Sequence, residues 1–117
     1  MRFINDQLHG VIDYLAALAL IIAPFVLGFT GLAQLLSVAA GVALIIYSLL
    51  TSYSLSARKA IPFNIHLMID FLAGAAFVAA PFVLGFEGLV KTYFLVMGGA
   101  VILVVLLTDP NTATAEA

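Results

Sequence analysis

Two histidine–aspartate pairs are the part of this sequence best suited to chemistry. His9 precedes Asp13 by four residues, and His66 precedes Asp70 by the same interval. A spacing of four places both side chains of a pair on one face of an α-helix, one turn apart. An aspartate within an apolar membrane helix costs a few kcal/mol unless it is paired or hydrated. These four residues are therefore the candidate ligand site or polar network.

Three uses of the four residues are open. The first is a structural hydrogen-bond network that fixes helix register near the lipid headgroups, and the sequence favours it because no further ligand motif is present. The second is a ligand site, since paired imidazoles can hold haem or another tetrapyrrole, and two histidines with two aspartates can hold a divalent metal ion. The third is a proton or ion relay through histidines that titrate near neutrality. No cofactor is the first expectation.

The composition indicates that this chain lies in a lipid membrane. The chain has 117 residues, of which 65% are hydrophobic and 9% charged, and its mean hydropathy is +1.26. A soluble domain has about 45–50% apolar and about 25% charged residues. Four apolar runs, 11–29, 32–53, 65–86 and 89–107, are each near the ~20 residues that cross a bilayer. The sequence therefore predicts an all-α membrane protein with four transmembrane helices.

An internal repeat organises the four runs. Residues 9–51 and 66–108, aligned without gaps at an offset of 57, are identical at 21 of 43 positions. Such self-similarity indicates a duplicated unit, here a helical hairpin. Because each hairpin crosses the membrane twice, the two copies form tandem, parallel repeats related by a pseudo-two-fold axis along the membrane normal. We expect one membrane domain over 1–117, with a cytoplasmic linker at 54–64 and a disordered tail at 109–117.

The face of each helix that carries a histidine–aspartate pair also carries small residues. Small residues let membrane helices approach closely. The sequence therefore predicts that the first and third helices face each other through this stripe, which gathers the four polar residues near the cytoplasmic end of the interface. The alanines predicted to pack there are Ala16, Ala19, Ala23, Ala73, Ala76 and Ala80.

Each hairpin turn is marked by two glycines, preceded about one turn earlier by a proline. Glycine adopts the left-handed conformations that end one helix and aim the next, and proline within a helix removes a backbone donor and kinks it. The residues predicted for kinks and turns are Pro24, Gly28, Gly31, Pro81, Gly85 and Gly88.

The basic residues predict the orientation of the chain. Arg2, Arg58 and Lys59 lie on the side that holds both termini, and Lys91 lies on the other side. Cytoplasmic segments of membrane proteins carry the excess of Lys and Arg. We therefore expect a multi-pass protein of the cell inner (plasma) membrane with both termini in the cytoplasm.

The hairpin resembles the SPW-repeat family of small bacterial membrane proteins. In that family the first helix carries Ser-Pro-Trp, followed by a short apolar stretch with glycine, a turn and a second helix. The matching segments here begin Ala23-Pro24-Phe25 and Ala80-Pro81-Phe82, so alanine and phenylalanine replace serine and tryptophan in both copies. The resemblance implies four helices in two hairpins and implies no reaction.

The sequence favours a small non-enzymatic accessory or interaction subunit. The chain has no cysteine and a net charge of −2, which exclude thiol chemistry and give no sign of a nucleic-acid partner. It has no Gly-rich phosphate loop and no nucleophile with a base beside it. The expected partners are the lipid bilayer and another membrane protein or a second copy of the chain. A metal- or tetrapyrrole-binding protein is the alternative, and a proton or ion transporter is third.

Overall fold

The computed structural model describes residues 2–51 and 61–111. They form four α-helices: α1 (Asp6–Val26), α2 (Gly31–Leu49), α3 (Phe63–Leu84) and α4 (Gly88–Leu107). All four are long and apolar enough to cross a membrane. The predicted all-α membrane fold with four transmembrane helices is therefore confirmed. Arg58, Lys59, most of the predicted linker 54–64 and the tail beyond residue 111 lie outside the described residues.

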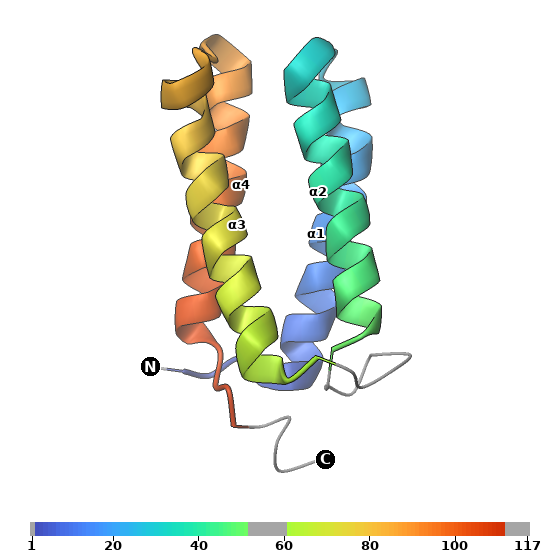
Figure 1. Cartoon of the computed structure of the whole chain (residues 1–117), viewed down its shortest axis with the longest axis vertical. Helices are drawn as coiled ribbons and strands as arrows, with labels where there is room; N and C mark the ends of the chain where they lie inside the picture. The colour runs from blue at the N-terminus through green and yellow to red at the C-terminus, as the bar shows by residue number, and fades with distance from the viewer. Residues whose placement is uncertain (1, 52–60, 112–117) are drawn as a thin grey trace.

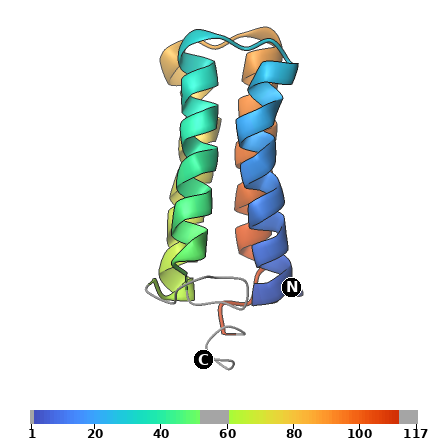
Figure 2. The ribbon, with the colours of Figure 1, turned by 90° about the vertical axis from the view of Figure 1, so that its right-hand side faces the viewer.

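The helices are arranged as two hairpins, α1–α2 and α3–α4, which stand side by side along the long axis of the molecule (Figure 1). Both hairpin turns lie at one end of the bundle, as the view turned by 90° also shows (Figure 2). We call this the turn end. The chain enters α1 and leaves α4 at the opposite end, which we call the termini end. The arrangement is compatible with a tandem repeat of one hairpin.

Helix α1 begins N-terminal to the apolar run 11–29 that predicts it. The helix starts at Asp6, and the side chain of Asn5 accepts a hydrogen bond from the Leu8 amide at 2.8 Å, which satisfies one of the free amides of the first turn. The apolar run itself begins only at residue 11 because the first turns contain Asp6 and His9. Both polar side chains are buried within the bundle instead of facing lipid.

Left-handed glycines end the first helix of each hairpin. Gly28 and Gly85 have φ of 76° and 74°, and the following amides of Phe29 and Phe86 donate to the carbonyls of the two helix prolines at 2.7 and 3.0 Å. This pattern satisfies carbonyls that a helix end leaves free. The glycines that open α2 and α4 also have positive φ, 62° for Gly31 and 59° for Gly88. Pro24 and Pro81 lie inside α1 and α3 and are buried.

Within each hairpin the two helices approach closely at glycines. A Cβ atom on Gly41 of α2 would lie 2.8 Å from the carbonyl oxygen of Ala17 in α1. In the second hairpin, a Cβ atom on Gly98 of α4 would lie 2.6 Å from the carbonyl oxygen of Gly74 in α3. Contacts this short leave no space for a methyl group, and small residues are what permit such approach in membranes.

Gly98→Ala is therefore expected to destabilise the second hairpin by about 1–3 kcal/mol, because the added methyl group meets backbone that must move. Thermal unfolding in detergent, followed by circular dichroism, measures the change. Gly99→Ala is the matched control, since a Cβ atom there meets nothing within 4 Å. Equal melting temperatures for the two variants would contradict the close approach of α3 and α4.

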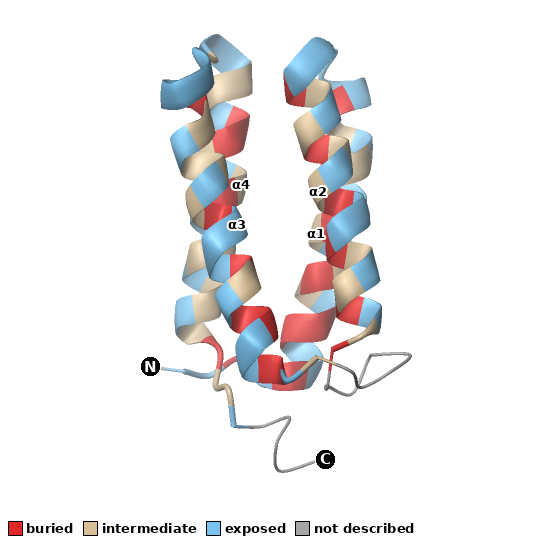
Figure 3. Ribbon diagram, viewed as in Figure 1, coloured by how far each residue is buried: buried red, intermediate tan, exposed pale blue. Residues whose placement is uncertain are grey.

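The outer surface of the bundle is apolar. Exposed positions run along the whole length of each helix (Figure 3), and they include large side chains such as Leu15, Leu35, Leu72 and Leu103, which are 62%, 63%, 61% and 56% exposed. Exposure of this apolar surface to water would be unfavourable, whereas lipid acyl chains solvate it. Two histidines and two aspartates of α1 and α3 are instead buried, and they form the site described next.

Candidate functional site

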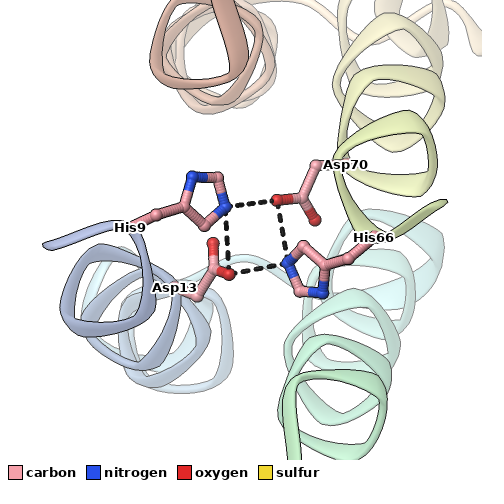
Figure 4. A group of neighbouring side chains, drawn as sticks. All are labelled: His9, Asp13, His66 and Asp70. Atoms are coloured by element: carbon pink, nitrogen blue, oxygen red, sulfur yellow. Dashed lines mark hydrogen bonds and ion pairs between the residues drawn. The ribbon is translucent and has the colours of Figure 1, made fainter. Parts of the chain in front are cut away.

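The two predicted pairs meet between the hairpins. His9 and Asp13 lie in the first turns of α1, and His66 and Asp70 lie in the first turns of α3, so all four reach the same point near the termini end (Figure 4). Their exposed fractions are between 0 and 5%. We call this group the His/Asp centre.

Each imidazole of the His/Asp centre lies between two carboxylates. His9 Nε2 is 3.0 Å from Asp70 Oδ2 in the other hairpin and 3.2 Å from Asp13 Oδ2 in its own helix. His66 Nε2 is 2.7 Å from Asp13 Oδ2 and 3.2 Å from Asp70 Oδ2. Two nitrogens and two oxygens thus alternate around one point. The sequence places each pair on one helix face, and the structure adds that each histidine contacts the aspartate of the opposite hairpin.

Two threonines orient the histidines. Thr108 Oγ1 lies 2.9 Å from His9 Nδ1, and Thr51 Oγ1 lies 2.7 Å from His66 Nδ1. Each threonine hydroxyl also donates to the main-chain carbonyl four residues earlier, 2.6 Å away. Because a hydroxyl has only one proton to donate, it must accept its other hydrogen bond from the imidazole. Both histidines therefore carry a proton on Nδ1 and direct Nε2 toward the carboxylates.

Backbone hydrogen bonds between distant chain segments bring the threonines to the histidines. The Ile4 amide donates to the Leu107 carbonyl at 3.0 Å, and the Asp109 amide donates to the Ile4 carbonyl at 2.9 Å. In the other half, the Ile61 amide donates to the Leu50 carbonyl at 2.7 Å. The segment that leads into each histidine helix is thus joined to the end of a helix from the other hairpin. Each histidine is consequently oriented by a threonine of the opposite hairpin.

Aromatic side chains complete the surroundings of the centre. The Tyr47 hydroxyl donates to Asp70 Oδ1, and its ring centroid lies 4.7 Å from that of His66. Phe63 packs edge-on against His9 with centroids 5.5 Å apart. The repeat places Val104 where Tyr47 stands in the first copy, and valine has no hydroxyl to donate. The two aspartates of the centre are therefore not equivalent.

Sequence reasoning missed three residues of this site. Thr51 and Thr108 were not singled out, although they are the last identical pair of the repeat, and that identity is the signal that could have found them. Tyr47 was not a candidate either. It gives no repeat signal, because its counterpart is valine.

The six alanines of the predicted stripe do not gather in one place, as the four polar residues do. Ala16 and Ala73 line a cavity between the hairpins, and Ala19 and Ala76 are exposed. Ala23 and Ala80 are partly buried against the apolar core. Among the described residues, close backbone contacts join α1 to α2 and α3 to α4, so the alanine stripe does not bring α1 and α3 into close contact.

The donors of the His/Asp centre suit a small divalent ion. The atoms that could coordinate all lie within 4.8 Å of one another. A tetrahedral ion with bonds of about 2.0–2.1 Å to nitrogen and oxygen holds its ligand atoms about 3.3–3.4 Å apart. The four N···O separations are 2.7–3.2 Å, the distances of direct contacts, so the side chains must move apart by a few tenths of an ångström to admit the ion. A tetrapyrrole fits less well, because the two carboxylates occupy the space between the imidazoles that its ring would need (Figure 4).

Together, the fold and the site define a multi-pass α-helical membrane protein with a buried His/Asp centre shared by two hairpins. The SPW repeat domain family matches residues 7–108, which is most of the chain. The chain therefore belongs to the SPW repeat family, as the Ala-Pro-Phe segments predict. Comparisons with curated proteins and with solved structures gave no match.

Proposed function

We propose that this chain is a small, non-enzymatic accessory protein of the bacterial inner membrane whose His/Asp centre binds a divalent transition-metal ion, with Zn²⁺ the ion that the donors fit best. The observation that carries the proposal is the convergence of two imidazole nitrogens and two carboxylate oxygens in one buried position. Two imidazoles and two carboxylates form a four-coordinate donor set of the kind that Zn²⁺ takes in proteins.

The threonines support a metal over a purely structural network. In metal sites, a ligating histidine almost always donates its other ring N–H to an outer partner, which fixes the tautomer and aims the ligating nitrogen. The hydroxyls of Thr51 and Thr108 provide this for both histidines of the centre. A threonine partner at each Nδ1 leaves both Nε2 atoms directed at one point.

A divalent ion is also compatible with the charges of the centre. Without an ion, ionised Asp13 and Asp70 require a second proton on each imidazole, and the two imidazole rings are only 5.5 Å apart. The two positive imidazoles then balance the two carboxylates. With a divalent ion the imidazoles stay neutral, and the two carboxylates balance the charge of the ion.

The proposed role of the His/Asp centre is to hold the two hairpins together. The outer faces of the hairpins can then contact a partner. The exposed apolar side chains of the helices offer contact surface to lipid, to another membrane protein or to a second copy of the chain. Arg2 lies at the termini end, and Lys91 lies in the first turn of α4, at the turn end. Together with Arg58 and Lys59, which stand between α2 and α3 in the sequence, the excess of basic residues supports cytoplasmic termini.

Metal analysis tests the proposed function. Protein purified in mild detergent, exposed to Zn²⁺ and then desalted is expected to retain the ion at near-stoichiometric level, whereas the His9→Ala/His66→Ala variant retains none. Ser37→Ala is the control, because Ser37 is a buried polar residue of α2 that hydrogen-bonds Tyr93 away from the centre. A wild-type protein that binds no metal would leave the centre a structural network, and a haem absorption band lost in the double variant would make it a tetrapyrrole site.

A further inference from the structure

A cavity of about 240 Å³ lies between the two hairpins and is partly open to the surroundings. All four helices contribute to its walls. Asp13, Asp70 and Tyr47 form its base, so it adjoins the His/Asp centre and extends from there toward the turn end. The remaining walls are apolar, and small residues are prominent among them: Ala16, Ala40, Ala43, Ala73, Gly74 and Gly98.

The hairpins cannot close this cavity by moving together, because they are joined on both sides of it. The His/Asp centre joins them at the termini end. Toward the turn end, the Tyr93 hydroxyl of α4 lies 2.6 Å from Ser37 Oγ of α2, which donates to the Leu20 carbonyl of α1 at 2.7 Å. The Tyr93 ring also packs edge-on against Phe29 at 5.2 Å. The two junctions fix the spacing of the hairpins between them.

Water is a poor occupant of this space. A buried water usually needs two to four polar partners, and apolar cavities without them stay dry. The polar groups at the base already bond to one another, since Tyr47 donates to Asp70 and the carboxylates face the imidazoles. The occupant that these walls favour is apolar.

The position of the cavity determines which apolar molecule can reach it. Its walls come from the middle of four helices that each have 19–22 residues, a length that spans the hydrocarbon core of a bilayer. At that depth the surrounding solvent consists of lipid acyl chains. We propose that the cavity binds one acyl chain of a membrane phospholipid, which enters sideways between the hairpins. This inference does not depend on a metal ion at the His/Asp centre.

Filling the cavity tests the inference with a closely matched control. Ala16→Leu/Ala73→Leu adds bulk to two cavity walls, whereas Ala19→Leu/Ala76→Leu makes the same changes at exposed positions of the same helices outside the cavity. The full chain is reconstituted in phosphatidylcholine vesicles with a trace of phospholipid that carries a photoactivatable diazirine midway along one acyl chain. Mass spectrometry then locates the cross-links after irradiation.

Wild type and the control variant are expected to be labelled at cavity walls such as Ala43 and Val101 and at outward residues such as Leu35. The filled variant is expected to keep the outward labels, which report a folded bundle in lipid, and to lose the cavity labels. Cavity labels that persist in the filled variant, or that are missing from wild type, would overturn the proposal. If the double variant does not fold, Ala43→Leu narrows the same cavity with one substitution.

A second measurement tests whether water or a second copy of the chain occupies the cavity instead of an acyl chain. Since the chain has no cysteine, Ala43→Cys introduces a single thiol at the cavity wall. Protection of this thiol from a water-soluble maleimide in vesicles is expected. Rapid modification would show that the cavity is filled with water. A disulfide to a second copy of the chain would show that another chain occupies it. Either result would overturn the proposal.

Discussion

Asp70→Ala is expected to lower the free energy of unfolding by about 3–5 kcal/mol, which is the typical cost of removing one partner from a buried ion pair. The substitution removes the carboxylate to which the Tyr47 hydroxyl donates and one of the two carboxylates that each histidine Nε2 contacts. It also removes a contact between the hairpins, because His9 belongs to the other one. Unfolding in mixed micelles at increasing denaturing detergent measures the loss.

Glu87→Ala is the control for this change. It also removes one carboxylate, but Glu87 is exposed at the turn end, and its side chain makes no capping hydrogen bond to α4. We expect little change in stability from it. An Asp70→Ala variant as stable as Glu87→Ala would show that the His/Asp centre does not hold the hairpins together.

Zinc is expected to stabilise the wild-type protein against heat, with a melting temperature that rises with free Zn²⁺ and falls when a chelator is added. An ion that binds the folded state alone stabilises it by about 2.7 kcal/mol at a hundred times its dissociation constant. The ion would bridge α1 and α3, so its removal loosens a buried polar connection between the hairpins at the termini end. Thermal unfolding at a series of free Zn²⁺ concentrations measures this dependence.

Two comparisons make the zinc experiment specific. The His9→Ala/His66→Ala variant should melt at the same temperature with and without Zn²⁺, because it lacks both nitrogen ligands. Mg²⁺ should have no effect on wild type, since it prefers six oxygen ligands and gives up water reluctantly. Equal stabilisation of the double variant, or stabilisation by Mg²⁺ as strong as by Zn²⁺, would argue against a metal site at the His/Asp centre.

Failure of these two predictions would have different meanings. Loss of the zinc effect together with a large effect of Asp70→Ala would leave a structural hydrogen-bond network, the use that the sequence alone favours. A zinc effect with little effect of Asp70→Ala would indicate that the ion binds through the remaining ligands.

The helices can be predicted from the sequence, because the signals for them are local. Four apolar runs of membrane-spanning length predict four helices, and the left-handed glycines lie where the repeat places the hairpin turns. The spacing of four places each histidine with its aspartate on one helix face. The Ala-Pro-Phe segments indicate the family. None of these inferences requires knowledge of which helix lies beside which.

Which residues meet across the hairpins depends on how the two hairpins pack together. Helical periodicity shows which side chains share a face, but in lipid a face toward a neighbouring helix and a face toward acyl chains are both apolar. For this reason the alanine stripe did not predict the cavity or the exposure of Ala19 and Ala76. Likewise, the contacts of Thr51 and Thr108 depend on backbone pairing between distant chain segments. The partners of His9 and His66 were therefore set by the packing of the hairpins, which no local pattern encodes.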